Sequence, residues 1–195
     1  MSSSPQIITV FGSSRPREGD ADYAQARELG WALAAKSFVV CTGGYGGVME
    51  AASRGAKDAG GRTLAVTAKF FRADANRWVD EEIRVDTWQA RLFELIRRGH
   101  GYVACKGGTG TLVELAVVWE MLNKHVMEPK PFVVLGDFWQ PIIERVREVE
   151  APGRPSSEVV DSPWREANNR LIHPVPTPSA AADFLARRLL PPLQP

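Results

Sequence analysis

The chain has 195 residues, of which 44% are hydrophobic and 24% charged, the proportions of an ordinary globular domain. This length fits one α/β domain with enough apolar residues to bury a substantial core. The formal net charge of +1 gives no reason to expect binding to nucleic acid or to an anionic membrane. Any anion must therefore be held by a local site, and no apolar run is long enough to span a bilayer.

The two cysteines, Cys41 and Cys105, do not form a CxxC pair. The polar start Met1–Pro5 lacks the apolar region typical of a signal peptide. A reducing, cytoplasmic location is therefore the expectation. The three histidines lack the spacing of metal ligands, so we expect no metal site.

The first half of the chain alternates short apolar runs with segments of helical periodicity. Short runs that end at a glycine or a polar loop are typical of strands buried in a parallel sheet. Segments with apolar residues three or four positions apart indicate helices. In chain order, we expect a strand at 7–11, a helix at 23–36, a strand at 38–41, a helix at 48–59, a strand at 63–66, an irregular aromatic segment at 70–78 and a short strand at 83–85.

The second half continues this alternation and ends in a segment rich in Pro, Ser and Asn. Strands that alternate with helices predict an α/β fold, here a Rossmann-like doubly wound parallel sheet with helices on both faces. We expect a single nucleotide-binding domain at 1–195. Its remaining elements are a helix at 87–98, a strand at 102–105, an apolar helix at 111–122, a strand at 132–135, a helix at 141–149, an irregular segment at 151–178 and a closing helix at 179–190.

Three loops rich in small residues each follow an expected strand. In an open parallel sheet, ligands bind outside the carboxyl ends of the strands, so all three loops should share one edge. Two of them run into helices, whose N-terminal N–H groups can bind an anion such as phosphate. One such loop would indicate only a tight turn, but three favour a phosphate site. The expected binding residues are Gly12, Ser13, Gly43, Gly44, Gly47, Lys106, Gly107, Gly108, Thr109, Gly110 and Thr111.

These loops do not match the usual nucleotide-binding fingerprints. The motif GxxxxGK[ST] is absent, and neither long loop gives a clean GxGxxG. An ATPase or an NAD-dependent dehydrogenase is therefore disfavoured, and a less usual nucleotide site is favoured. Trp78 and Trp88 flank the irregular segment and could wall a pocket for the base, but core packing is the simpler interpretation of both.

Glu114 follows Thr111 by three positions and allows two interpretations. With Thr111 near the N-cap, its carboxylate could complete a capping box, or it could point into the cleft next to a phosphosugar. Arg91 taken alone indicates a solvated helix face. Lys106 is equally consistent with a phosphate ligand and with a solvent-exposed lysine. Glu50 could be a second acid or a partner of a helix dipole.

Four separated elements together resemble the LOG family, long labelled "possible lysine decarboxylase". They are Gly12–Ser14, Gly43–Met49, Arg91 and Gly107–Glu114, the last of which is similar to the family motif PGGxGTxxE. The resemblance covers roughly residues 6–150. Three positions depart from the family pattern: Lys106 replaces its proline, Leu92 its lysine and Glu50 its glycine.

The resemblance implies a Rossmann-like fold, a homodimer and a phosphoribohydrolase without a cofactor. Such an enzyme cuts the N-glycosidic bond of a nucleoside 5′-monophosphate, either AMP or a cytokinin ribotide, and its catalytic pair maps onto Arg91 and Glu114. Decarboxylase activity is not expected, because no lysine is placed to form a Schiff base with pyridoxal phosphate. The three departures resemble a branch that includes molybdenum-cofactor carriers. The alternative is therefore a non-catalytic protein that binds or carries a nucleotide or phosphorylated cofactor.

Overall fold

The computed structural model describes residues 5–150 and 171–191, which form a seven-stranded sheet. The strand order is β4-β3-β2-β1-β5-β6-β7, and every neighbouring pair is parallel. Apart from β4, most residues of these strands are apolar because both faces of the sheet are covered. The strands are β1 (Ile7–Phe11), β2 (Val39–Thr42), β3 (Thr63–Ala68), β4 (Glu81–Val85), β5 (Gly101–Ala104), β6 (Phe132–Leu135) and β7 (Ile172–Val175).

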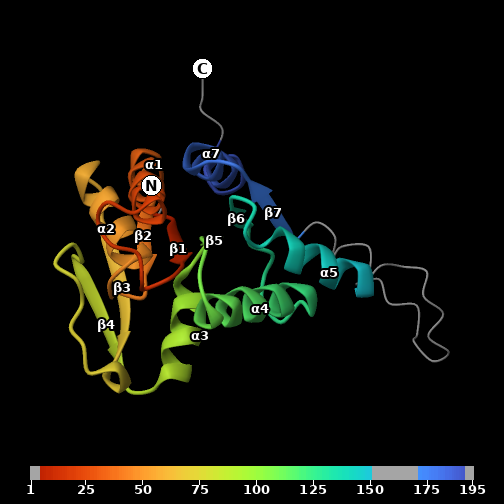
Figure 1. The fold of residues 1–195 in the computed structure, drawn as a ribbon, viewed down its shortest axis with the longest axis horizontal. Helices are drawn as coiled ribbons and strands as arrows, with labels where there is room; N and C mark the ends of the chain where they lie inside the picture. Colours follow the sequence, from red (N-terminus) through yellow and green to blue (C-terminus); the bar gives the residue numbers. More distant parts are fainter. Residues whose placement is uncertain (1–4, 151–170, 192–195) are drawn as a thin grey trace.

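Helices pack on both faces of this sheet (Figure 1). A short 3-10 helix, η1 (Lys69–Phe71), follows β3. None of the helices within the described ranges combines the length and apolarity that crossing a membrane requires. One face is covered by α1 (Ala21–Ala35), α2 (Val48–Asp58) and α7 (Pro178–Leu189), and the other by α3 (Trp88–Arg98), α4 (Thr109–Asn123) and α5 (Gln140–Glu150).

Two hydrophobic cores result from this arrangement, one on each side of the sheet. Successive strand residues point to opposite faces, so Ile8 and Val10 pack under α1 and α2 while Phe11 packs towards α4. The predicted Rossmann-like, doubly wound parallel sheet is confirmed.

The segment expected to be irregular contains a strand. Residues 172–175 form β7, which pairs with β6 and buries Ile172 and Val175. Pro174 lacks an N–H to donate, but β7 is an edge strand, where proline is tolerated. The prediction of irregular structure at 151–178 is therefore wrong for 172–175, and residues 151–170 lie outside the described part of the chain.

The sheet grows in opposite directions from its centre. The strands β1 to β4 extend one way, whereas β5 to β7 extend the other way from the far side of β1. The connections that leave β1 and β5 therefore diverge, which opens a crevice above the carboxyl ends of these two strands. The first and third glycine loops both lie at this point.

The close packing of α1 on α2 depends on two glycines. A Cβ atom at Gly30 would overlap the carbonyl oxygen of Ala52, and one at Gly55 would overlap that of Arg27. The two helix backbones therefore touch, and neither position can accept a side chain without moving a helix.

We expect Gly30→Ala to lower the free energy of unfolding by about 1–3 kcal/mol, because overpacking outweighs the better helix propensity of alanine. Chemical denaturation measures this change. Glu28→Ala, at an exposed position of the same helix, should stay within about 0.5 kcal/mol of the wild type. Equal stabilities of the two variants would contradict the packing argument.

Candidate functional site

A cleft of about 1030 Å³ opens at the crevice between β1 and β5. Its walls come from the loops after these strands, from α3 and from the first turns of α4. Most of the residues expected from the sequence meet there. They are Gly12, Ser13, Arg91, Lys106, Gly107, Gly108, Thr109, Gly110, Thr111 and Glu114.

The third glycine loop delivers the N-terminus of α4 to the cleft. A Cβ atom at Gly107 would overlap the side chain of Thr111, whereas Cβ atoms at Gly108 and Gly110 would meet no protein atom within 4 Å. The N-cap residue is Gly108, and no side chain caps this end of the helix. Open backbone N–H groups and the helix dipole can therefore bind an anion here.

The first loop is fixed beside the third. The N–H of Ser13 donates to the carbonyl of Lys106 at 3.3 Å, and its carbonyl accepts from the N–H of Val48 at 2.8 Å. A Cβ atom at Gly12 would overlap the side chain of Val48. The Ser13 hydroxyl accepts from the N–H of Arg15 at 3.1 Å, which keeps this loop folded at the rim of the cleft.

Gly43, Gly44 and Gly47 of the second loop do not line the cleft. A Cβ atom at Gly43 would overlap the guanidinium of Arg91, and one at Gly47 would overlap the carbonyl oxygen of Ser13. Gly44 and Gly47 also have positive φ angles of 80° and 69°, which favour glycine. These glycines shape the site from behind, and their contact with a ligand stays a prediction.

Arg91 is buried, with 7% of its surface exposed, and is not part of a solvated helix face. Its Nε donates to the carbonyl of Val66 at 2.9 Å, and its Nη2 donates to that of Gly43 at 3.0 Å. The rings of Tyr45 and Phe71 lie 5.3 and 5.6 Å from the guanidinium carbon. Burial lowers the pKa of Arg91, an effect that the nearby Glu114 opposes.

Glu114 lies beside Arg91, with 3.9 Å between its Oε1 and the Arg91 Nη1. The capping-box interpretation is wrong, because α4 begins at Thr109 and its N-cap is Gly108. The carboxyl side chain is 16% exposed. Burial raises the pKa of Glu114 to about 7, although Arg91 acts in the opposite direction. A carboxyl group with a pKa near neutrality can both accept and donate a proton.

The residues that depart from the LOG pattern have distinct surroundings. Lys106 pairs with Asp22, with 2.9 Å between Nζ and Oδ2, and both side chains line the cleft. Leu92 is buried against the core and touches the cleft wall. Glu50 is outside the cleft lining and accepts a hydrogen bond from the Tyr23 hydroxyl at 3.3 Å. Its place in the first turn of α2 fits a helix-dipole partner.

Four aromatic residues complete the cleft, namely Tyr45, Phe71, Trp88 and Phe138. Of these, the sequence pointed to Trp88 alone as a wall for a base. Tyr45 lies inside the second glycine loop, and from this position the sequence could also have predicted a second aromatic ring in the cleft wall. Trp78 does not line the cleft and instead lies against the guanidinium groups of Arg54 and Arg77. The side chains that line the cleft therefore combine an apolar surface with an anion-binding end.

Each of the two cysteines comes shortly before a glycine loop in the sequence. Cys41 and Cys105 are free and buried, and burial raises the pKa of each thiol to about 12. Thiols with so high a pKa are not nucleophilic near neutral pH, so both residues act in packing. Within residues 5–150 and 171–191, no group of three or more His, Cys, Asp or Glu side chains could hold a metal ion.

Comparison with protein families identifies a match over most of the chain. The model of the SLOG cluster4 family matches residues 5–151. An uncharacterized protein of Archaeoglobus fulgidus is 34% identical over 129 residues, which cover 66% of this chain and 82% of that protein. These matches confirm the family resemblance that the glycine motifs predict.

Two relatives with named activities match this chain over smaller fractions of their own lengths than the Archaeoglobus protein does. The pyrimidine/purine nucleotide 5′-monophosphate nucleosidase of Escherichia coli (strain K12) is 28% identical over 145 residues, which cover 68% of this chain and 31% of that enzyme. The cytokinin riboside 5′-monophosphate phosphoribohydrolase of Mycobacterium marinum is 34% identical over 97 residues, which cover 48% of this chain and 52% of that enzyme.

Solved structures share the fold. The molybdenum cofactor binding protein of Rippkaea orientalis is 24% identical, with a TM-score of 0.74 and coverage of 96% of this chain and 99% of that one. The molybdenum cofactor carrier protein of Chlamydomonas reinhardtii is also 24% identical, with a TM-score of 0.72 and coverage of 96% and 100%. At this identity the likeness establishes the Rossmann-like architecture alone.

The raised pKa of Glu114 makes stability depend on pH. The folded protein holds the proton of Glu114 up to about pH 7, whereas the unfolded chain releases it near the ordinary value of 4.5. The free energy of unfolding should therefore fall by about 2–3 kcal/mol as pH rises from about 4.5 to 7. Glu114→Gln removes this loss and should be more stable than the wild type at pH 8 and similar at pH 4.5.

Denaturant titrations between pH 4.5 and 8 measure this difference. Glu120→Gln serves as the matched control, because Glu120 lies on the same helix with a side chain that is 58% exposed. A Glu114→Gln variant that keeps the wild-type pH dependence would contradict the raised pKa.

Proposed function

Because the chain belongs to the SLOG cluster4 family, we propose that its cleft binds a nucleoside 5′-monophosphate and hydrolyses the N-glycosidic bond. The products are a free base and ribose 5-phosphate. One observation carries the proposal, namely the buried Arg91 beside a Glu114 whose pKa is raised to about 7. The named activities of the two relatives, which act on nucleotide monophosphates, support it.

The proposed phosphate position is the N-terminus of α4. The backbone N–H groups of Gly108 to Thr111 and the two threonine hydroxyls supply donors, and the open space above the glycines lets phosphate oxygens approach. Ser13 and Arg15 line the same cleft from the first loop. Their hydroxyl and guanidinium groups add donors on the opposite side of the phosphate.

The base is proposed to lie against the aromatic side chains. Tyr45 and Phe71 meet edge to face, with ring centroids 5.4 Å apart, and both contact the guanidinium of Arg91. Trp88, which is 36% exposed, lines the same cleft. Planar bases stack well on such rings, so these side chains would hold the base while the phosphate loop holds the other end.

Hydrolysis requires a group that stabilises the positive charge developing on the sugar and a base that deprotonates the attacking water. Cleavage of the bond passes through an oxocarbenium-like sugar, as in glycoside hydrolysis. The Glu114 carboxylate would stabilise that charge and accept a proton from the water whose oxygen bonds to the sugar carbon as the bond to the base breaks. The departing base would take up a proton from solvent, and Glu114 would later release its own proton to solvent. Arg91 would use Nη1, the guanidinium nitrogen that faces Glu114, to hold a ribose hydroxyl or a phosphate oxygen.

We expect purified protein to release the base from AMP and Glu114→Gln to reduce kcat by about 100-fold or more. The KM for AMP should change much less, because the phosphate loop is intact. Since the ionised carboxylate is the active form, the wild-type rate should rise as pH increases through about 7. Chromatographic detection of free adenine measures both effects.

Glu120→Gln again provides the control for loss of one carboxylate from α4. Equal rates for the wild type and Glu114→Gln would remove Glu114 from the mechanism. Arg91→Lys should also lose activity, because one ammonium group cannot reproduce the contacts with two carbonyl oxygens and a carboxylate.

A carrier function is the second candidate, and the size of the cleft favours it. At about 1030 Å³, the cleft is at the upper end of the range of about 300–1,000 Å³ that is usual for small-molecule pockets. Such a cleft has room for a phosphorylated cofactor larger than AMP. The two solved structures described above are named as binding or carrying the molybdenum cofactor. AMP that binds by calorimetry but is not hydrolysed would favour this function.

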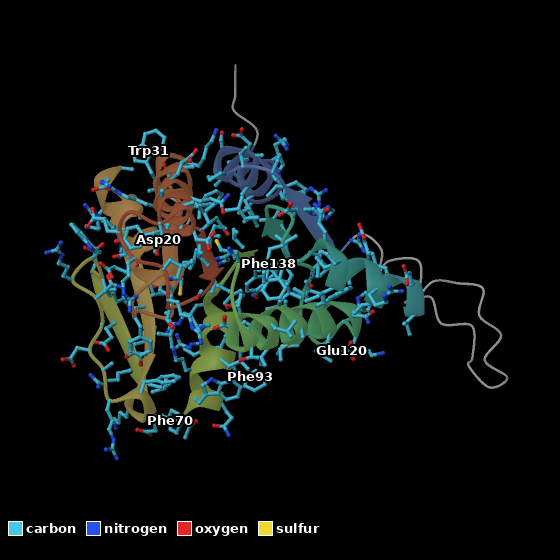
Figure 2. All side chains as sticks on the ribbon, viewed as in Figure 1. Asp20, Trp31, Phe70, Phe93, Glu120 and Phe138 are labelled. Atoms are coloured by element: carbon cyan, nitrogen blue, oxygen red, sulfur yellow. The ribbon has the colours of Figure 1, made fainter. Side chains whose placement is uncertain are left out.

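A cytoplasmic homodimer is part of the proposal. Phe93 on α3 is 53% exposed (Figure 2). The helix α4 has several partly buried apolar residues, among them Leu112 and Val117. A second copy of the chain would cover this surface. Light scattering should give twice the mass of one chain, and Phe93→Asp should shift the protein towards the monomer. A monomeric wild type would contradict the dimer.

A further inference from the structure

The mouth of the cleft has an ion pair that the proposed hydrolysis does not use. The Lys106 Nζ lies 2.9 Å from the Asp22 Oδ2, and the two side chains are 53% and 37% exposed. Lys106 comes directly before the glycine loop, and Asp22 lies in the first turn of α1. The pair therefore connects the two sides of the cleft next to the N-terminus of α4.

The charges around the cleft balance one another. Its charged lining residues are three cations and three carboxylates. Arg91 and Glu114 form the buried pair, and the carboxylate of Asp20 accepts a hydrogen bond from the N–H of Arg17 at 2.8 Å. The remaining carboxylate, Asp22, neutralises Lys106. Among the three cations that line the cleft, Arg15 is therefore the one that has no carboxylate within 4 Å in the described part of the chain.

We infer that the ion pair of Asp22 and Lys106 restricts the ligand to a single phosphate group. The inference rests on the proposed function, because it places the 5′-phosphate at the N-terminus of α4 and the ribose beside Glu114. All three residues line the cleft, but the Glu114 side chain is only 16% exposed, whereas those of Lys106 and Asp22 are 53% and 37% exposed, so the pair lies nearer to solvent than Glu114 does. A second phosphate would extend away from the ribose and reach the mouth of the cleft, where the pair stands.

A second phosphate meets two obstacles there. The Asp22 carboxylate repels it, and Lys106 can attract it only by leaving Asp22. The first phosphate avoids both, since backbone N–H groups and the helix dipole bind it without breaking an ion pair. The pair thus acts as a specificity determinant that discriminates AMP from ADP by charge.

Calorimetric titration with AMP and ADP tests the inference independently of turnover. The wild type should bind AMP about tenfold or more tightly than ADP. Asp22→Asn should raise the affinity for ADP about five- to tenfold and that for AMP about twofold or less, because one repulsive charge next to the second phosphate is gone. Asp22→Glu should retain the discrimination.

Lys106→Met should lower the affinity for ADP more than that for AMP, because Asp22 is then uncompensated. The double variant should return the ratio of the two affinities towards that of the wild type. These differences should shrink at high salt, since the pair is solvent-accessible.

Asp183→Asn provides the matched control. Asp183 pairs with Lys36 at 2.8 Å, with both side chains about as exposed as those of the mouth pair, 45% for Lys36 and 44% for Asp183. The variant loses the same single charge, but Lys36 caps the opposite end of α1. It should leave the ratio of ADP to AMP affinity unchanged.

An unchanged affinity ratio in Asp22→Asn, or equal changes in Asp22→Asn and Asp183→Asn, would overturn the inference. A wild type that binds ADP as tightly as AMP would overturn it too. AMP that binds without being hydrolysed would contradict only the proposed hydrolysis, and the affinity ratio would still decide the role of the pair. No binding of AMP would overturn both.

Discussion

The site depends on one constraint, which is that a buried guanidinium must have partners. Arg91 reaches them at two neighbouring strands, at the carbonyl of Val66 within β3 and at that of Gly43 directly after β2. A side chain at residue 43 would occupy the space of the Arg91 guanidinium, so the position of Arg91 requires a glycine there. Once Arg91 is held in this way, its remaining nitrogen faces Glu114, and the rings of Tyr45 and Phe71 close around it.

Burial of Glu114 lowers the stability of the fold at neutral pH, but it also gives the carboxyl group a pKa suited to proton transfer. Its position on α4 keeps the carboxyl group largely away from solvent. Its Oε1 lies 3.9 Å from the Arg91 Nη1, which is too far for a strong ion pair. Its pKa therefore rises to about 7 through burial, despite the nearby cation. This acid with a perturbed pKa, close to a helix N-terminus that no side chain caps, is the arrangement on which the proposed hydrolysis rests.

The three glycine loops have different structural roles, although their composition indicates one shared role. All three are rich in small residues, and the sequence predicts a phosphate-binding role for all three. In the folded protein the first and third loops line the cleft, whereas Gly43, Gly44 and Gly47 fit around Arg91, β3 and the first loop. Glycine is needed both where a ligand approaches and where another part of the protein does, and local sequence does not distinguish these cases.

By itself the sequence determined the alternation of strands and helices, the parallel sheet and the convergence of the glycine loops on one edge, because these follow from local periodicity and from the geometry of parallel strands. Only the tertiary structure decided that β7 joins the sheet, that Glu114 is not a helix cap, that Phe71 and Phe138 line the cleft and that Lys106 pairs with Asp22. Each of these depends on where the backbone places a helix end or on contacts between residues far apart in the chain, and such contacts leave no periodic signal in the sequence.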